Sequence, residues 1–115
     1  MEILTISVFN VVGNSFCVEA DDGQKVYEII KKALQENRKV KVSFQNVEML
    51  TSAFLNTAIG QLYKDFTEEE IKSSLSVDNL ANEDAALLKR VVSTAKLYYK
   101  DPEEMEKSIA EILGE

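Results

Sequence analysis

The sequence contains no histidine and only one cysteine, Cys17. It therefore lacks the side chains for a Ser-His-Asp triad, for a Cys-His pair and for a zinc site built from nitrogen and sulfur ligands. The single cysteine cannot form an internal disulfide, and its apolar neighbours Phe16 and Val18 indicate a buried strand thiol rather than a reactive one. These absences exclude much of the familiar hydrolytic enzymology.

Glycine is scarce as well, and long apolar runs are missing. The glycines are spread from Gly13 to Gly114, too far apart to form a loop that cradles phosphates, so any ATPase activity is expected to belong to a partner. No stretch is apolar for the ~18 residues that a membrane span requires. The start of the chain also lacks the pattern of a secretory signal. We therefore expect a cytoplasmic protein that does not enter a membrane.

Positive charge is in the minority, because 13 Lys and Arg stand against 20 Asp and Glu and give a formal net charge of −7. This charge opposes the phosphate backbone, so no nucleic-acid binding is expected. The acids gather at predicted helix starts, such as residues 68–70 and 83–84, where the helix dipole accounts for them. We therefore predict no catalytic carboxylate pair, no metal site and no cofactor.

The composition fits a single globular domain over residues 1–115, since 45% of the residues are hydrophobic and 29% are charged. Alternating apolar residues predict a first strand over residues 3–11. Gly13-Asn14 then favours a tight turn into a second strand over residues 15–18. The chain is therefore expected to open with an antiparallel β-hairpin.

Helices and strands alternate in the rest of the chain. Apolar residues three and four apart predict helices over 23–36, from Thr51-Ser52 to Phe66 and from Asn82 onward, with a short turn or helix after Thr67. Further strands are predicted at 40–44 and 75–77. Another amphipathic helix is predicted over 102–113, with docking on its own domain as the default and dimerisation as the alternative. This order predicts an α/β fold with a mixed β-sheet of about four strands.

Residues 40–56 carry a family resemblance. The strand Val40-Lys41-Val42-Ser43-Phe44 is followed by a turn, by a buried position at Val47 and by Thr51-Ser52-Ala53-Phe54-Leu55 at a helix start. This resembles the central element of STAS domains, where a pattern of the form Asp-Ser-Ser-Gly-Leu begins the helix, and it is closer to the STAS-like family of unknown function. The likeness covers residues 40–92 and implies a STAS-like domain, here with an opening hairpin and an added C-terminal helix.

The resemblance also implies a function. In anti-sigma-factor antagonists, an ATP-binding, histidine-kinase-like partner phosphorylates the second serine of the pattern, which releases the complex. Ala53 stands at that position here, so Thr51 or Ser52 is the substitute acceptor; alternatively, these hydroxyls only cap the helix. We expect a non-catalytic regulatory module that binds a protein partner through residues 45–56. The predicted contact residues are Asn46, Thr51, Ser52 and Asn56.

Other functions remain open. In one alternative, the partner of the regulatory module is a STAS-like paralogue instead of a histidine-kinase-like protein. In a second, the protein is an acidic inhibitor or decoy from a mobile element that blocks a basic surface of a larger machine, and its affinity collapses as salt rises. In a third, it is a small enzyme or ligand carrier that uses hydroxyls and carboxylates, for which a pocket or a bound small molecule would speak.

Overall fold

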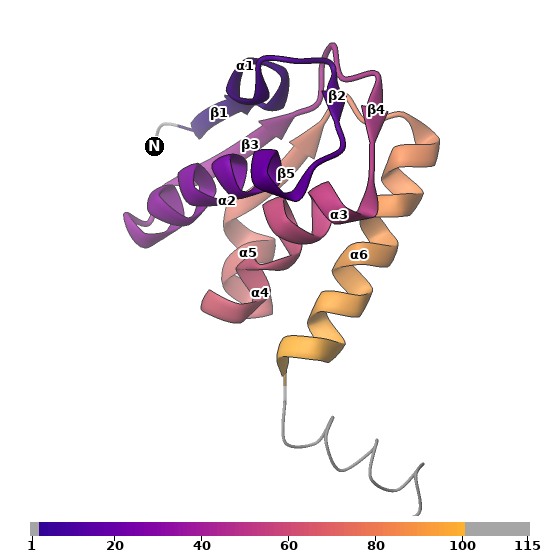
Figure 1. The fold of residues 1–115 in the computed structure, drawn as a ribbon. Helices are drawn as coiled ribbons and strands as arrows, with labels where there is room; N and C mark the ends of the chain where they lie inside the picture. Colours follow the sequence, from indigo (N-terminus) through magenta and orange to yellow (C-terminus); the bar gives the residue numbers. More distant parts are fainter. Residues whose placement is uncertain (1–2, 101–115) are drawn as a thin grey trace, which may run out of the picture.

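A three-stranded parallel sheet lies at the centre of the fold. The computed structural model describes residues 3–100 (Figure 1). The strands of this sheet are, in spatial order, β1 (Ile3–Ser7), β3 (Lys39–Ser43) and β5 (Leu75–Asp78). The register aligns Ile6 with Val42 and Val42 with Val77. Because side chains alternate across a strand, these apolar residues share one face of the sheet.

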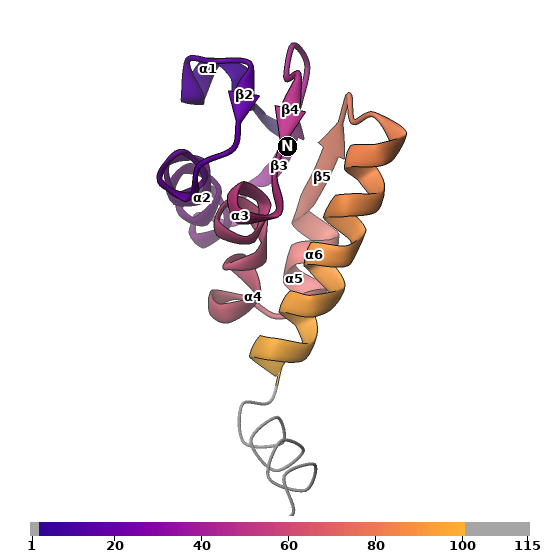
Figure 2. The same cartoon turned by 45° about the vertical axis from the view of Figure 1, so that its right-hand side comes forward.

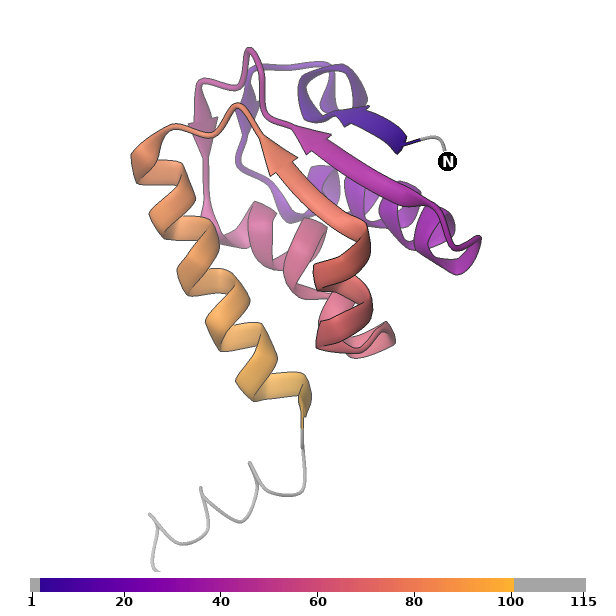
Figure 3. The same cartoon turned by 180° about the vertical axis from the view of Figure 1, so that it is seen from behind.

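Helices lie against that face, and within residues 3–100 no helix covers the other face. After a short first helix, which is described below, the helical elements are α2 (Ala20–Gln35), α3 (Ser52–Leu55), the π-helix η1 (Asn56–Gly60), α4 (Leu62–Asp65), α5 (Glu68–Ser74) and α6 (Asn82–Lys100). Seen from behind, β3 and β5 lie in front of α2 and α3 (Figure 3). The open face carries the aligned polar row Thr5, Lys41 and Ser76. Parallel sheets are usually covered on both faces, and this polar row makes the uncovered face compatible with water.

A separate pair of short strands links the sheet to the helices. β2 (Phe16–Cys17) and β4 (Met49–Leu50) pair in parallel, with Phe16 opposite Met49. Figure 2 shows the two strands side by side, with β2 leading to α2 and β4 leading to α3. The starts of α2 and α3 therefore come from one small, shared element.

The predicted opening hairpin is wrong. Residues 8–12 form the helix α1 (Val8–Val12), whose first turn is capped by the Ser7 side chain, which accepts a hydrogen bond from the Asn10 amide at 3.2 Å. Gly13 has φ of 78° and donates its amide to the Phe9 carbonyl at 2.8 Å, so it ends this helix instead of forming a hairpin turn. A glycine with positive φ can either end a helix or form a hairpin turn. The β-branched pair Val11-Val12 favours a strand, which is why the sequence predicted a hairpin here.

The expected mixed sheet of about four strands is also corrected. Within residues 3–100 the structure has the strands β1 to β5 in two small sheets, and every strand pair is parallel. The missed strand is β4, which the sequence reading placed in a loop because only two residues pair. An α/β architecture is nevertheless confirmed, as are the strands predicted at 40–44 and 75–77, which the structure places at β3 and β5.

Within residues 3–100, the helix predictions are confirmed except in one region. The helix predicted at 23–36 is α2, which begins earlier, at Ala20; a helix follows Thr67 as α5, and α6 begins at Asn82 as expected. The single helix expected up to Phe66 is divided into α3, η1 and α4. The helix predicted over 102–113 lies outside the described residues. Among residues 3–100, no helix is both long enough and apolar enough to cross a bilayer.

The core lies between the sheet and the helices. Its largest fully buried side chains are Phe54, Ile30, Leu55, Ile59, Leu62, Val8, Val26, Val40, Val42 and Cys17. The prediction of a buried strand thiol is thus confirmed, and burial, followed by the charge of Asp22, raises the pKa of Cys17 to about 11. The segment from α3 to α4 contributes much of this core, so its path is fixed by packing.

The close approach of α2 to the α3–η1 segment requires glycine at one position. A Cβ atom added to Gly23 would lie 2.6 Å from the Phe54 carbonyl oxygen and 3.0 Å from Thr57 Cβ. These distances are below van der Waals contact, so a side chain at Gly23 would push the two helices apart. Gly60, which the sequence analysis expected to mark close packing, is less tight, because an added Cβ would lie 3.7 Å from Ala95 Cβ.

Candidate partner-binding surface

Thr51 joins the start of α3 to the chain that enters α2. Its side-chain oxygen accepts a hydrogen bond from the Phe54 amide at 3.2 Å, which caps α3, and its hydroxyl donates to the Val18 carbonyl at 2.7 Å. The residue is half-buried. The single hydroxyl proton is therefore engaged in a tertiary contact, and the geometry of Thr51 is that of a structural cap.

Ser52, by contrast, presents its hydroxyl to solvent. It is the first residue of α3, it is exposed, and its side chain makes no hydrogen bond to any residue between 3 and 100. The following residue, Ala53, is exposed as well. Of the two adjacent hydroxyls singled out from the sequence, Ser52 is the accessible one.

Asn56 lies one helical turn beyond Ser52 on the same side of the helix, and its amide donates to the Ser52 carbonyl. It is exposed and begins η1, in which the Asn56 carbonyl accepts the Gln61 amide at 3.0 Å, five residues on. The Thr57 hydroxyl donates to the Ala53 carbonyl at 3.0 Å, and the Gln61 side chain donates to the Thr57 carbonyl at 2.9 Å. These side chains supply donors where the π-turn interrupts the regular ladder, and such turns are frequent at functional sites.

Asn46 does not join these residues. It lies in the loop between β3 and β4 with φ of 67°, and the Val47 amide closes the turn on the Phe44 carbonyl at 3.1 Å. Figure 1 shows this loop at one end of β4 and α3 at the other. The structure thus brings Thr51, Ser52 and Asn56 together and places Asn46 apart from them.

Two exposed apolar residues on β2 and β4, the strands that lead into α2 and α3, were not predicted. Phe16 and Met49 face each other across β2 and β4, and they are 49% and 51% exposed. Met49 is three residues before Ser52, within about 10 Å along an extended chain. We call Phe16, Met49, Ser52 and Asn56 the docking surface. The sequence did contain a signal for this exposure. Phe16 and Met49 are each followed by another apolar residue, Cys17 and Leu50, and consecutive side chains of a strand point to opposite faces.

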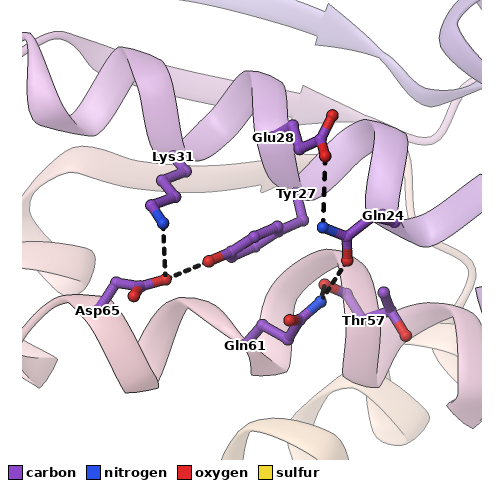
Figure 4. Close-up of polar contacts among 7 residues, drawn as sticks. All are labelled: Gln24, Tyr27, Glu28, Lys31, Thr57, Gln61 and Asp65. Atoms are coloured by element: carbon purple, nitrogen blue, oxygen red, sulfur yellow. Dashed lines mark hydrogen bonds and ion pairs between the residues drawn. The ribbon is translucent and has the colours of Figure 1, made fainter.

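A polar network holds α2 against the segment from η1 to α4 (Figure 4). Gln61 donates to the Gln24 side chain at 2.9 Å, and the Tyr27 hydroxyl donates to Asp65. Lys31 lies 3.8 Å from the same carboxylate. Burial, followed by the hydrogen bond to Asp65, raises the pKa of Tyr27 to about 12. The network fixes the helix that carries Ser52 and Asn56, and it requires no catalytic role to explain it.

A cleft of about 570 Å³ lies elsewhere, where α4, α5 and α6 meet. Aromatic rings of Tyr63, Phe66 and Tyr99 line it, and the ion pair between Lys96 and Glu68, at 2.8 Å, stands in its wall. None of the docking-surface residues lines this cleft. It is the feature on which the ligand-carrier alternative would rest. In the part of the chain that is described, no group of three or more acidic or thiol side chains is arranged to hold a metal ion.

Comparison with known proteins connects the site to a family. Residues 22–85, more than half of the chain, match a family described as a STAS-like domain of unknown function. The match contains the whole segment from β3 through the docking-surface residues of α3 and η1 to the start of α6. No curated protein and no solved structure was matched.

Proposed function

The chain belongs to the family of STAS-like domains of unknown function, and on that premise we propose that it is a regulatory module that binds a partner protein through the docking surface and catalyses no reaction itself. The observation that carries this proposal is the exposed pair Phe16 and Met49 on the strands that lead into α2 and α3, together with the exposed hydroxyl of Ser52 at the start of α3. Two half-exposed apolar side chains on a rigid strand pair offer about 1 kcal/mol each when a partner covers them.

Rigid support makes this surface suitable for recognition. The strand pair is tied to both helix starts by the contact of Thr51 with Val18, at 2.7 Å, and Ser15 donates to the Glu48 carboxylate at 3.0 Å beside it. A partner therefore meets a surface that is already ordered, and little conformational entropy is lost on binding. Ligand sites in α/β folds often lie beyond the carboxyl ends of strands, and Ser52 follows the carboxyl end of β4.

The family resemblance favours an ATP-binding, histidine-kinase-like protein as this partner. In that version Ser52 is the acceptor of a phosphate, because its hydroxyl is exposed whereas that of Thr51 is bonded to Val18. A phosphate adds about −1.5 to −2 charges. Three residues from Met49 along the chain, this charge would oppose apolar contact and release the partner.

Affinity purification from the native host tests the proposal. The wild-type chain is compared with Ser52→Asp and with Asn56→Trp, which places bulk on the surface, and phosphorylation is mapped at Thr51 and Ser52. We expect a specific co-purifying protein that both variants lose. If each variant retained every partner of the wild type, the docking surface would be misplaced.

A further inference from the structure

Among residues 3–100, the β2–β4 pair exposes the apolar side chains of Phe16 and Met49, and the chain segments that build it carry negative charge. The segments that build it, residues 14–24 and 45–56, contain Glu19, Asp21, Asp22 and Glu48 and no lysine or arginine. Glu19, Asp21 and Glu48 are exposed, whereas Asp22 is partly buried and pairs with Lys25 at 3.4 Å. The exposed charges that these two segments carry are therefore all negative, and we call Glu19, Asp21 and Glu48 the acidic rim.

The carboxylates of Glu19 and Glu48 make few hydrogen bonds or ion pairs within the described residues. Glu19 is the N-cap residue of α2, but its side chain makes no capping hydrogen bond. Glu48 accepts one hydrogen bond, from Ser15 at 3.0 Å, and forms no ion pair among the described residues. A carboxylate accepts several hydrogen bonds, so both side chains retain acceptor capacity for a partner.

We propose that the docking surface binds a basic amphipathic segment of a partner protein, with an apolar side chain over Phe16 and Met49 and lysine or arginine opposite Glu19 and Glu48. This inference rests on the proposed function, since it names the chemistry of the partner that the same surface receives. Opposite charge speeds the encounter and aligns the partners, while burial of the apolar pair supplies short-range affinity.

A second copy of this chain fits the surface less well. A symmetric dimer through this face would bring the acidic rim of one copy against that of the other, and like charges across an interface are unfavourable. Adjacent basic residues stand outside these two segments, as Lys31-Lys32, Arg38-Lys39 and Lys89-Arg90.

The test is an amide-resolved NMR titration of the full chain with synthetic amphipathic peptides of about 18 residues, long enough for a helix. One peptide is made of leucine and lysine, and the other has glutamate in place of lysine. We expect the lysine peptide to shift the resonances of Phe16, Met49 and Ser52 selectively and the glutamate peptide to leave them unchanged. Equal binding of both peptides, or shifts spread evenly over the acidic surface, would overturn the inference.

A matched pair of double variants distinguishes the local effect of the acidic rim on peptide binding from the effect of the protein's net charge. Glu19→Gln with Glu48→Gln should weaken binding of the lysine peptide about tenfold, the effect of roughly 0.7 kcal/mol for each exposed charge. Glu36→Gln with Glu69→Gln removes the same charge from exposed positions outside the two segments and should weaken it less than about twofold. Equal losses in both double variants would contradict a specific rim.

The outcomes also distinguish this inference from the proposed function. If the native partner is lost from Ser52→Asp but is held unchanged by the Glu19→Gln and Glu48→Gln variant, the docking surface stands and the basic partner is refuted. If the lysine peptide binds at Phe16 and Met49 but no substitution in the docking surface changes binding of the native partner, the preference for a basic segment is confirmed and the proposed function is wrong.

Discussion

The hydroxyl of Thr51 donates to the carbonyl of Val18 at 2.7 Å, and this contact joins the start of α3 to the segment between β2 and α2. The same oxygen accepts the Phe54 amide at 3.2 Å. One side chain therefore caps a helix and fixes the position of two helix starts. Ser52, its neighbour, has no such duty in the described chain and is available at the surface.

Replacement of Thr51 by valine should therefore be costly, whereas Ser52→Ala should be mild. Thr51→Val keeps the shape but loses the cap and the tertiary hydrogen bond, so the free energy of unfolding should fall by about 1–2 kcal/mol. Ser52→Ala should change it by less than about 0.5 kcal/mol. Urea unfolding followed by circular dichroism measures both. Equal effects of the two substitutions would show that the division of roles between these hydroxyls is wrong.

The two internal glycines should respond differently to alanine. At Gly23 the new Cβ would lie 2.6 Å from the Phe54 carbonyl oxygen, so the free energy of unfolding should fall by about 2 kcal/mol or more. At Gly60 the nearest contacts would be 3.7 Å, and alanine favours helix, so stability should be unchanged or rise by up to about 1 kcal/mol. Thermal unfolding of both variants provides the measurement, and a stable Gly23→Ala protein would contradict the described packing.

Stability should depend on the ionisation of Tyr27 at high pH. Its pKa is raised from 10.0 to about 12 in the folded chain, first by burial and then by Asp65. Since the folded pKa is the higher one, this contribution is complete below about pH 10 and is lost as pH rises from there towards 12. Tyr27→Phe should lower stability at neutral pH by about 1 kcal/mol through loss of the hydrogen bond.

The comparison of wild type with Tyr27→Phe isolates that effect from other groups that titrate at high pH. The difference in unfolding free energy between the two proteins should shrink when pH is raised from neutral to above 10, as measured by urea unfolding at each pH. A difference that stays constant over this range would mean that Tyr27 does not gain its raised pKa from the folded structure.

Cys17 should be inert in the native protein. Its side chain is fully buried, and its pKa is raised from 9.0 to about 11, so little thiolate is present at about pH 8. A thiol reagent such as DTNB should react with Cys17 only after denaturant unfolds the chain. Fast reaction of the native protein would contradict the described position of β2 and the pairing of Cys17 with Leu50.

Long elements with regular periodicity could be predicted from the sequence, and short ones could not. Apolar spacing gave α2 and α6 with small errors in their boundaries, and alternation gave β3. The opening helix α1 was read as strand because β-branched Val11-Val12 favours strand locally. Its caps, Ser7 and Gly13, decide otherwise in the folded chain.

The candidate site was foreseen in part for the same reason. The hydroxyls at a helix start and Asn56 one turn later follow from local spacing, and the structure places them together. The exposure of Phe16 and Met49 depends on the pairing of β2 with β4, two strands that are far apart in the sequence. Asn46 was included by its nearness along the chain, but it precedes β4, whereas Ser52 follows that strand.

The most direct test of the docking surface removes its apolar pair. Calorimetry of the purified complex with the native partner would compare wild type with Phe16→Ser and Met49→Ser combined, and with Ile3→Ser and Val77→Ser combined. The control residues are strand residues that are 55% and 40% exposed in the other sheet. The first pair should weaken binding by about tenfold or more, the effect of roughly 1 kcal/mol for each buried side chain, and the control should leave it unchanged. Unchanged affinity in the Phe16 and Met49 variant, with the fold intact by circular dichroism, would contradict the account.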